Sequence, residues 1–171
     1  MNLPDKPSYE CGDCTICCSL LSVDDDAANF HKPILEPCKH LCPSGCGIYE
    51  SPEKPSICST FYCMYRINAY GTFKESDRPD KLGVLVVMND IAAPFTQKTG
   101  VPSFTVYETR PDGFDGYWPE KLISRLQKKW LLILMPWSRR QTKYQMDPTI
   151  KFIGPTKWMA LLDKFTGGKH G

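Results

Sequence analysis

The stretch "KLGVLVVMND", residues 81–90, carries the clearest strand signal in this chain of 171 residues. It is a short run of aliphatic and β-branched residues bounded by turn formers, which is typical of a buried strand. A chain of this length fits one domain, residues 1–171, and can bury a core without disulfides or bound metal ions to stabilise it. Hydrophobic residues make up 42% of the chain and charged residues 23%, as in an ordinary globular protein.

Toward the C-terminus, strand and helix patterns alternate. "SFTVYETR" (103–110) alternates as a half-buried strand does, and "LLILMPW" (131–137) and "IKFIG" (150–154) indicate two more strands. "PEKLISRLQKKW" (119–130) has its apolar residues on one face of a helix, with proline in the first turn. "PTKWMALLDKFTGG" (155–168) predicts a terminal helix that ends at glycine. We therefore predict an α+β fold, with residues 66–171 as its α+β remainder.

Toward the N-terminus, the chain becomes rich in cysteine and proline. "SLLSV" (19–23) predicts a short strand and "FYCMYRINAYG" (61–71) a helical turn, but most of this part has the composition of loops. All the cysteines of the chain lie here, in three blocks: Cys11, Cys14, Cys17 and Cys18; then Cys38, Cys42 and Cys46; then Cys58 and Cys63. We predict that residues 9–65 form a loop-rich metal-binding region in which all three blocks converge.

Location bears on the state of these thiols. "MNLPDKPSYE" (1–10) has no apolar run that could serve as a secretory signal. The longest apolar run, "WLLILMPW" (130–137), is far shorter than the ~20 residues of a transmembrane helix. We therefore predict a cytoplasmic protein without membrane contact. Because disulfides are rare in a reducing cytosol, the nine cysteines are predicted to be metal ligands.

The cysteine spacing leaves the metal open. CxxC, as in "CGDC" (11–14), places two thiolates on one side of a tight turn. CxxCxxC resembles the first three ligands of bacterial ferredoxin clusters, so it favours an iron–sulfur cluster. The short paired spacings and the surplus of thiols favour zinc slightly, since eight thiolates fill two four-ligand sites and leave one spare. We therefore predict zinc or iron as the cofactor, an iron–sulfur cluster included.

Two local features refine the prediction. Successive side chains diverge, so the neighbours Cys17 and Cys18 are difficult to aim at one ion. One of them is expected to bind a different ion, to bridge two ions or to stay free. His40 lies among the middle cysteines and is a further candidate ligand, whereas His31 and His170 lack comparable neighbours.

The combined motif resembles a known family. "CGDCTICC", "KPILEPCKHLCPSGCGIYE" and "KPSICSTFYC" are similar to the bacterial YkgJ-type cysteine-cluster family, also called the CxxCxxCC or zinc- or iron-chelating domain. The likeness covers roughly residues 9–90 and includes "RPDKLGVLV" (78–86). Lys54 stands where the family usually has arginine, and the Cys38–Cys42 spacing is wider by a residue. The resemblance implies a chelated metal held by the nine cysteines.

The predicted function is therefore that of a metal-binding cysteine-cluster protein with a structural or redox role. One alternative is a zinc-stabilised nucleic-acid-binding module that uses the basic segment 121–143, although a pI near 8.0 makes this partner less favoured. Another is a metal- or cluster-dependent enzyme. No HExxH, Walker A, Rossmann, serine-nucleophile or radical-SAM CxxxCxxC pattern appears, so the sequence indicates no catalytic residue and identifies no protein or redox partner.

Overall fold

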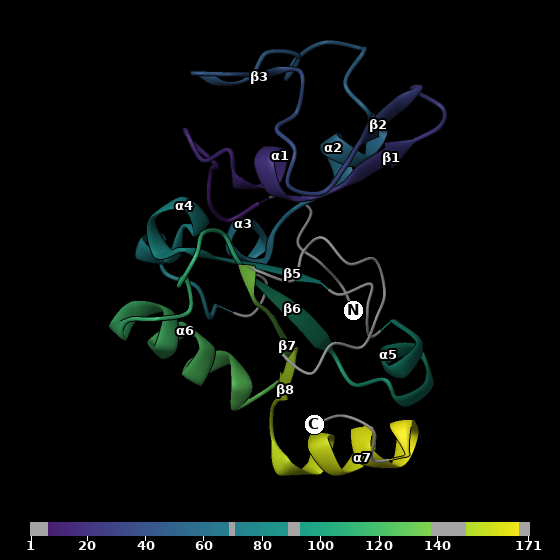
Figure 1. Cartoon of the computed structure of the whole chain (residues 1–171), viewed down its shortest axis with the longest axis vertical. Helices are drawn as coiled ribbons and strands as arrows, with labels where there is room; N and C mark the ends of the chain where they lie inside the picture. The colour runs from purple at the N-terminus through teal and green to yellow at the C-terminus, as the bar shows by residue number, and fades with distance from the viewer. Residues whose placement is uncertain (1–6, 69–70, 89–92, 138–149, 168–171) are drawn as a thin grey trace.

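A four-stranded sheet forms the centre of the C-terminal part of the chain (Figure 1). The computed structural model describes residues 7–68, 71–88, 93–137 and 150–167. The strands lie in the order of their sequence: β5 (Val84–Met88), β6 (Ser103–Glu108), β7 (Leu131–Met135) and β8 (Lys151–Ile153). β6 and β7 are parallel, and the other two neighbouring pairs are antiparallel. The four strands predicted from the sequence are thus confirmed.

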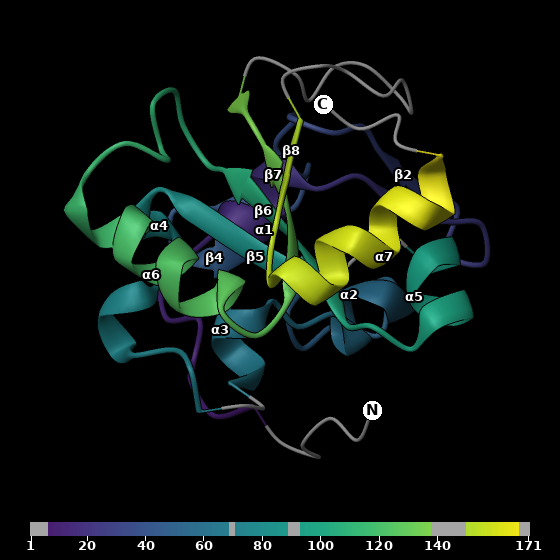
Figure 2. The same ribbon diagram turned by 90° about the horizontal axis from the view of Figure 1, so that it is seen from below.

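Helices cover both faces of this sheet (Figure 2). Because alternate residues of a strand face opposite sides, β7 divides the core into two clusters. Leu132 packs in the cluster that contains Leu122 and Leu126 of α6 (Tyr117–Gln127), the crossover helix between the parallel strands. Leu131 and Ile133 pack with Phe95 and Leu162, which belong to α5 (Ala93–Thr99) and α7 (Thr156–Thr166).

The N-terminal part lies at the β5 side of the sheet and consists of short elements joined by loops (Figure 1). Two antiparallel hairpins occur there, β1–β2 and β3–β4. The predicted strand at 19–23 is wrong, because a helix occupies the residues up to Leu20 and a strand starts only at Val23. The element bounds are α1 Ile16–Leu20, β1 Val23–Asp25, β2 Phe30–Lys32, β3 Leu41–Cys42, β4 Gly45–Cys46, α2 Ser56–Thr60, α3 Met64–Ile67, η1 Glu75–Asp77 and α4 Pro79–Leu82.

One hydrophobic cluster joins the two parts. Leu20 of α1 and Met64 of α3 are buried in the same cluster as Val86 of β5 and Val106 of β6. The structure is therefore a small single-domain α+β fold, as the sequence predicts. Within the described residues, no helix has the length and hydrophobicity needed to cross a membrane.

Candidate metal centre

Eight of the nine cysteines line one cavity, which we call the cysteine cavity. Its volume is about 630 Å³. Val87 and Met88 of β5 and Tyr107 of β6 also line it, so it lies between the cysteine blocks and the sheet. The predicted convergence of the three blocks is confirmed. The cysteines of the cavity are Cys11, Cys14, Cys17, Cys18, Cys38, Cys46, Cys58 and Cys63.

The first block is positioned by a tight turn and a short helix. Gly12 has φ 55°, a left-handed conformation that glycine adopts without strain, and the amide of Cys14 donates to the carbonyl of Cys11 over 3.0 Å. α1 follows and carries Cys17 and Cys18. Arg78 fixes the turn from outside: its guanidinium lies 2.6 Å from the Asp13 carboxylate and 3.5 Å from the Cys11 carbonyl.

The middle block attaches to the first through its backbone. The amide of Cys38 donates to the carbonyl of Cys18 over 2.9 Å, and the amide of Leu41 donates to the carbonyl of Cys38 over the same distance. The β3–β4 hairpin then pairs Leu41 with Cys46, which returns Cys46 to the cavity.

The closing block comes from α2 and the start of α3. α2 carries Cys58 and is tied to β1, because the amide and hydroxyl of Ser56 donate to Asp25 over 3.0 and 3.1 Å. Cys63 is only 4% exposed and precedes α3 as its N-cap residue. The carbonyl of Arg66 accepts the amides of Ser8 and Tyr9, which brings the chain just before Cys11 against α3.

Electrostatic neighbours divide the cavity thiols into two sets. Burial raises the pKa of Cys17 well above its usual value, and the nearby charges of Cys63, Cys11 and Cys14 raise it further. Burial raises the pKa of Cys63 to about 11, and Cys11 and Cys14 are again the thiols that add to the shift. These four cysteines form the first thiol set: Cys11, Cys14, Cys17 and Cys63.

Two other cavity thiols, Cys18 and Cys58, have a different set of neighbours. Burial raises the pKa of Cys18 to about 11, and the largest contributions from neighbouring thiols come from Cys46, Cys38 and Cys58. The pKa of Cys58 is raised by burial and then by Cys38 and Cys46. Cys18, Cys38, Cys46 and Cys58 form the second thiol set. Cys11 and Cys17 are the members of the first set that couple with Cys18.

Cys42 is the cysteine that does not line the cavity. It lies in the β3–β4 hairpin, where its sulfur is 3.3 Å from the Ser44 hydroxyl and 3.3 Å from the Gly45 carbonyl. The hydrogen bond to Ser44 lowers the pKa of Cys42, whereas burial raises the pKa of Cys17, Cys18 and Cys63 in the cavity. The predicted ligand set thus separates into eight cysteines around one cavity and one outside it.

The sulfurs surround a space instead of meeting at a point. None of the nine cysteines forms a disulfide. Among the residues that the structure describes, no three His, Cys, Asp or Glu side chains are grouped so that they could hold one metal ion. Four thiolates bound tetrahedrally to one zinc at ~2.3 Å lie ~3.8 Å from one another. In a [4Fe–4S] cluster each thiolate binds its own iron atom, so the ligands lie further apart. The donor type and the size of the cavity fit such a cluster.

Two cationic side chains that sequence reasoning missed lie beside the cavity. Arg66 lines it: burial raises the pKa of Cys11, and the charge of Arg66 opposes that rise. Lys32 is 5% exposed and donates to the carbonyls of Leu21 and Pro33. Burial lowers the pKa of Lys32, whereas the charges of Cys38 and Cys18 raise it. Neither residue belongs to a cysteine motif, so only their positions in the fold reveal them.

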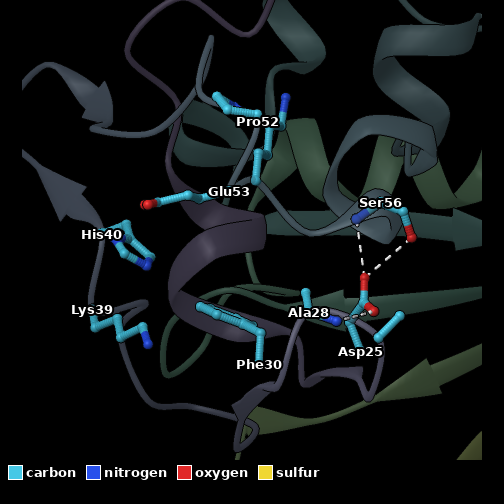
Figure 3. Close-up of a pocket in the computed structure, with 10 residues that line it drawn as sticks. Asp25, Ala28, Phe30, Lys39, His40, Pro52, Glu53 and Ser56 are labelled. Atoms are coloured by element: carbon cyan, nitrogen blue, oxygen red, sulfur yellow. Dashed lines mark hydrogen bonds between the residues drawn. The ribbon is translucent and has the colours of Figure 1, made fainter.

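His40 faces a second cavity (Figure 3). Its ring stacks on Phe30 with 5.8 Å between centroids, and it is not among the residues that line the cysteine cavity. The second cavity has a volume of about 490 Å³ and shares Phe30 and Lys54 with the cysteine cavity. Asp25, Lys39 and Glu53 also line it. Of the other histidines, His31 lies 3.2 Å from Asp24 on the surface, and His170 is outside the described residues.

The basic segment 121–143 is described up to Trp137. Arg125 pairs with the buried Asp77, and the ammonium of Lys129 lies 5.7 Å from the ring centroid of Trp130. Trp130 is 7% exposed and belongs to the core. The exposed aromatic residues of this region are instead Tyr117 and Trp118, at the start of α6. Arg139, Arg140, Lys143 and Tyr144 lie outside the described residues.

No protein-family model, curated protein or solved structure matches the chain.

The raised thiol pKa values make the stability of the metal-free protein depend on pH. A group with a higher pKa in the folded state than in the unfolded state holds more protons when folded, so the free energy of unfolding falls as pH rises between the two values. For Cys18 and Cys63 this interval runs from 9.0 to about 11. We expect the metal-free protein to lose stability over this interval.

The metal-loaded protein should not show this loss, because ligation has already removed the thiol protons. Urea unfolding of both forms from pH 7 to pH 11 measures the effect. Cys18→Ser should reduce the loss of stability of the metal-free protein between pH 9 and pH 11, and Cys42→Ser should not, because the pKa of Cys42 is lowered. Equal stability of the metal-free wild type at pH 8.5 and pH 10.5 would contradict the expectation.

Proposed function

We propose that this chain is a cytoplasmic metal-binding cysteine-cluster protein that chelates zinc or iron through the thiolates of the cysteine cavity. The observation that carries the proposal is the gathering of eight thiols from three separate blocks around one cavity. Buried thiols with raised pKa values are poor nucleophiles at neutral pH, which argues against a purely reactive role. A bound metal would replace the thiol protons and would fill the cysteine cavity.

The arrangement supports an iron–sulfur cluster more than zinc. The short sequence spacings favour zinc slightly, but the described thiols do not meet at the single point that a zinc ion requires. The similarity of residues 9–90 to the YkgJ-type family supports chelation of zinc or iron without deciding between them. An iron–sulfur cluster would give the protein a redox role, and zinc would give it a structural one.

Elemental analysis and visible absorption of protein purified without oxygen test the proposal. We expect iron and sulfide in stoichiometric amounts, with a visible band that bleaches on reduction. Cys18→Ser should lower the metal content and Cys42→Ser should not, since only Cys18 lines the cavity. Colourless protein with about two zinc ions per chain would retain the chelating function and reject the cluster. Protein without bound metal, both as purified and after anaerobic incubation with zinc or with iron and sulfide, would reject the proposal.

A second candidate function is that of a cluster-dependent enzyme. The second cavity supports it, because an open space of about 490 Å³ lined by both charged and aromatic side chains adjoins the cysteine cavity (Figure 3). His40 and Glu53 are the groups there that could exchange protons with a bound substrate. The nucleic-acid alternative has less support, since Trp130 is buried in the core.

A further inference from the structure

We propose that the cysteine cavity holds two separate four-cysteine centres, divided between the adjacent residues Cys17 and Cys18. This inference rests on the proposed function, to which it adds the ligand set of each centre. The first centre is bound by Cys11, Cys14, Cys17 and Cys63, and the second by Cys18, Cys38, Cys46 and Cys58. Cys42 ligates neither centre.

The division follows from the helix that carries both neighbours. Cys17 and Cys18 are successive residues of α1. In an α-helix, successive side chains point about 100° apart, because one turn takes about 3.6 residues. Two thiols with this relationship diverge from a common point. α1 therefore directs one thiol toward each part of the cavity.

Backbone contacts gather the first centre on one side of α1. The turn that joins Cys11 to Cys14 leads directly into this helix, and the amides of Ser8 and Tyr9 bind the carbonyl of Arg66. These bonds place the start of the first block against the N-terminus of α3, where Cys63 is buried. Cys63 is 45 residues or more from the other three ligands in sequence, and only the fold brings it to them.

A different set of contacts gathers the second centre. The bond from the Cys38 amide to the Cys18 carbonyl fixes the middle block next to α1. The β3–β4 hairpin returns Cys46, and the bonds from Ser56 to Asp25 hold the helix of Cys58 against β1. Each centre thus has its own supporting contacts, and the connection between them runs through α1.

Each centre also has its own buried cation. Arg66 lines the cavity beside Cys11, and its side chain is 12% exposed. Lys32 is almost fully buried near Cys18, Cys38 and Cys58, and its ammonium donates to two backbone carbonyls. A buried ammonium is stabilised by a nearby negative charge. Four thiolates carry four negative charges, so a four-cysteine centre stays anionic when it binds a metal core of charge +2 and requires such compensation. Two cations at two places fit two anionic centres.

The test combines single and double serine substitutions with metal analysis of protein purified without oxygen. Cys11→Ser and Cys58→Ser represent the two centres and leave the helix α1 unchanged. Each is expected to remove half of the bound metal. The double variant of Cys11 and Cys14 should lose no more metal than Cys11→Ser alone. The double variant of Cys38 and Cys58 should lose no more metal than Cys58→Ser alone. The double variant of Cys11 and Cys58 should lose all of the bound metal, and the control Cys42→Ser should lose none.

Alkylation mapped by mass spectrometry provides the second measurement. In Cys11→Ser, the thiols of Cys14, Cys17 and Cys63 should become reactive while those of the second centre stay protected. Cys58→Ser should give the reverse pattern. Reactivity of all remaining cavity cysteines in either variant, or loss of all metal from Cys11→Ser alone, would overturn the division into two centres. If the wild type binds metal but the variants give either of these results, only the division into two centres is rejected. If the wild type binds no metal, the proposed function itself is rejected.

Discussion

Replacing Cys14 by serine is expected to loosen the segments that carry the first thiol set, residues 9–17 and those around Cys63, while β5 keeps its protection from hydrogen exchange. The N-terminal part has little else to stabilise it: its helices are four or five residues long, and its strands two or three. Among the described residues before Cys63, Leu20 and Phe30 are the hydrophobic side chains that are buried. Binding of a structural metal contributes ~10 kcal/mol or more in small thiolate sites, comparable with the stability of a whole domain.

Hydrogen exchange of the metal-loaded protein measures this effect segment by segment. A loss of ~4 kcal/mol, well below the full contribution of the metal, would speed exchange roughly a thousandfold in the affected segment. We expect this around Cys63, which lies far from Cys14 in sequence but belongs to the same thiol set, and not in Val84–Val87. Cys42→Ser is the matched control, since it also replaces a thiol by a hydroxyl but outside the cavity. Unchanged exchange throughout 9–65 in Cys14→Ser would mean that the thiols do not support this region.

Phe104→Ala is expected to lower the free energy of unfolding of the whole protein by about 3–5 kcal/mol. Phe104 of β6 is 1% exposed and meets Trp130 edge to face, with 5.5 Å between ring centroids. Truncation leaves a cavity between the sheet and the side chains beneath α6 and removes this aromatic contact. Because the same hydrophobic cluster includes Leu20 and Met64, the loss should affect the cysteine region as well as the sheet.

Urea unfolding followed by tryptophan fluorescence and by far-UV circular dichroism measures this change. Both probes should report one earlier transition, since one core serves both parts of the chain. Tyr117→Ala is the control: Tyr117 is aromatic too but 60% exposed, and its removal should cost less than about 0.5 kcal/mol. A Phe104→Ala protein within ~1 kcal/mol of wild type would contradict the assignment of Phe104 to the core.

The C-terminal part was the more predictable from sequence. Long apolar runs and a helical pattern of leucines identify β5, β6, β7, β8, α6 and α7, because in these segments the burial pattern and the local propensity agree. α5 (Ala93–Thr99) carries no comparable pattern and was not predicted. In the N-terminal part the elements span little more than one period of a helical or strand pattern, which is why a helix ending at Leu20 was mistaken for a strand.

The cysteine positions predicted that the three blocks would converge but not that Cys42 would lie outside the cavity that the other cysteines line. That Cys42 lies outside the cavity depends on the direction of the β3–β4 hairpin, and CxxxC spacing does not contain this information. Lys32 and Arg66 could not be found because an isolated basic residue usually indicates a solvated surface position. Their burial arises from the packing of segments that are distant in sequence.

The shared hydrophobic cluster has a consequence for the order in which the protein matures on the ribosome. All the cysteines are synthesised before Met64, but the hydrophobic cluster that buries Leu20 and Met64 is complete only when β6 and β7 have been made. At translation rates of ~5–20 residues per second, the roughly 70 residues up to Met135 take several seconds. During that time the cysteine-containing segment emerges from the ribosome before the sheet that later closes the cysteine cavity is complete. If the proposed function holds, we therefore expect the metal to enter after the C-terminal strands have formed, or from a donor that protects the exposed thiols of a nascent chain.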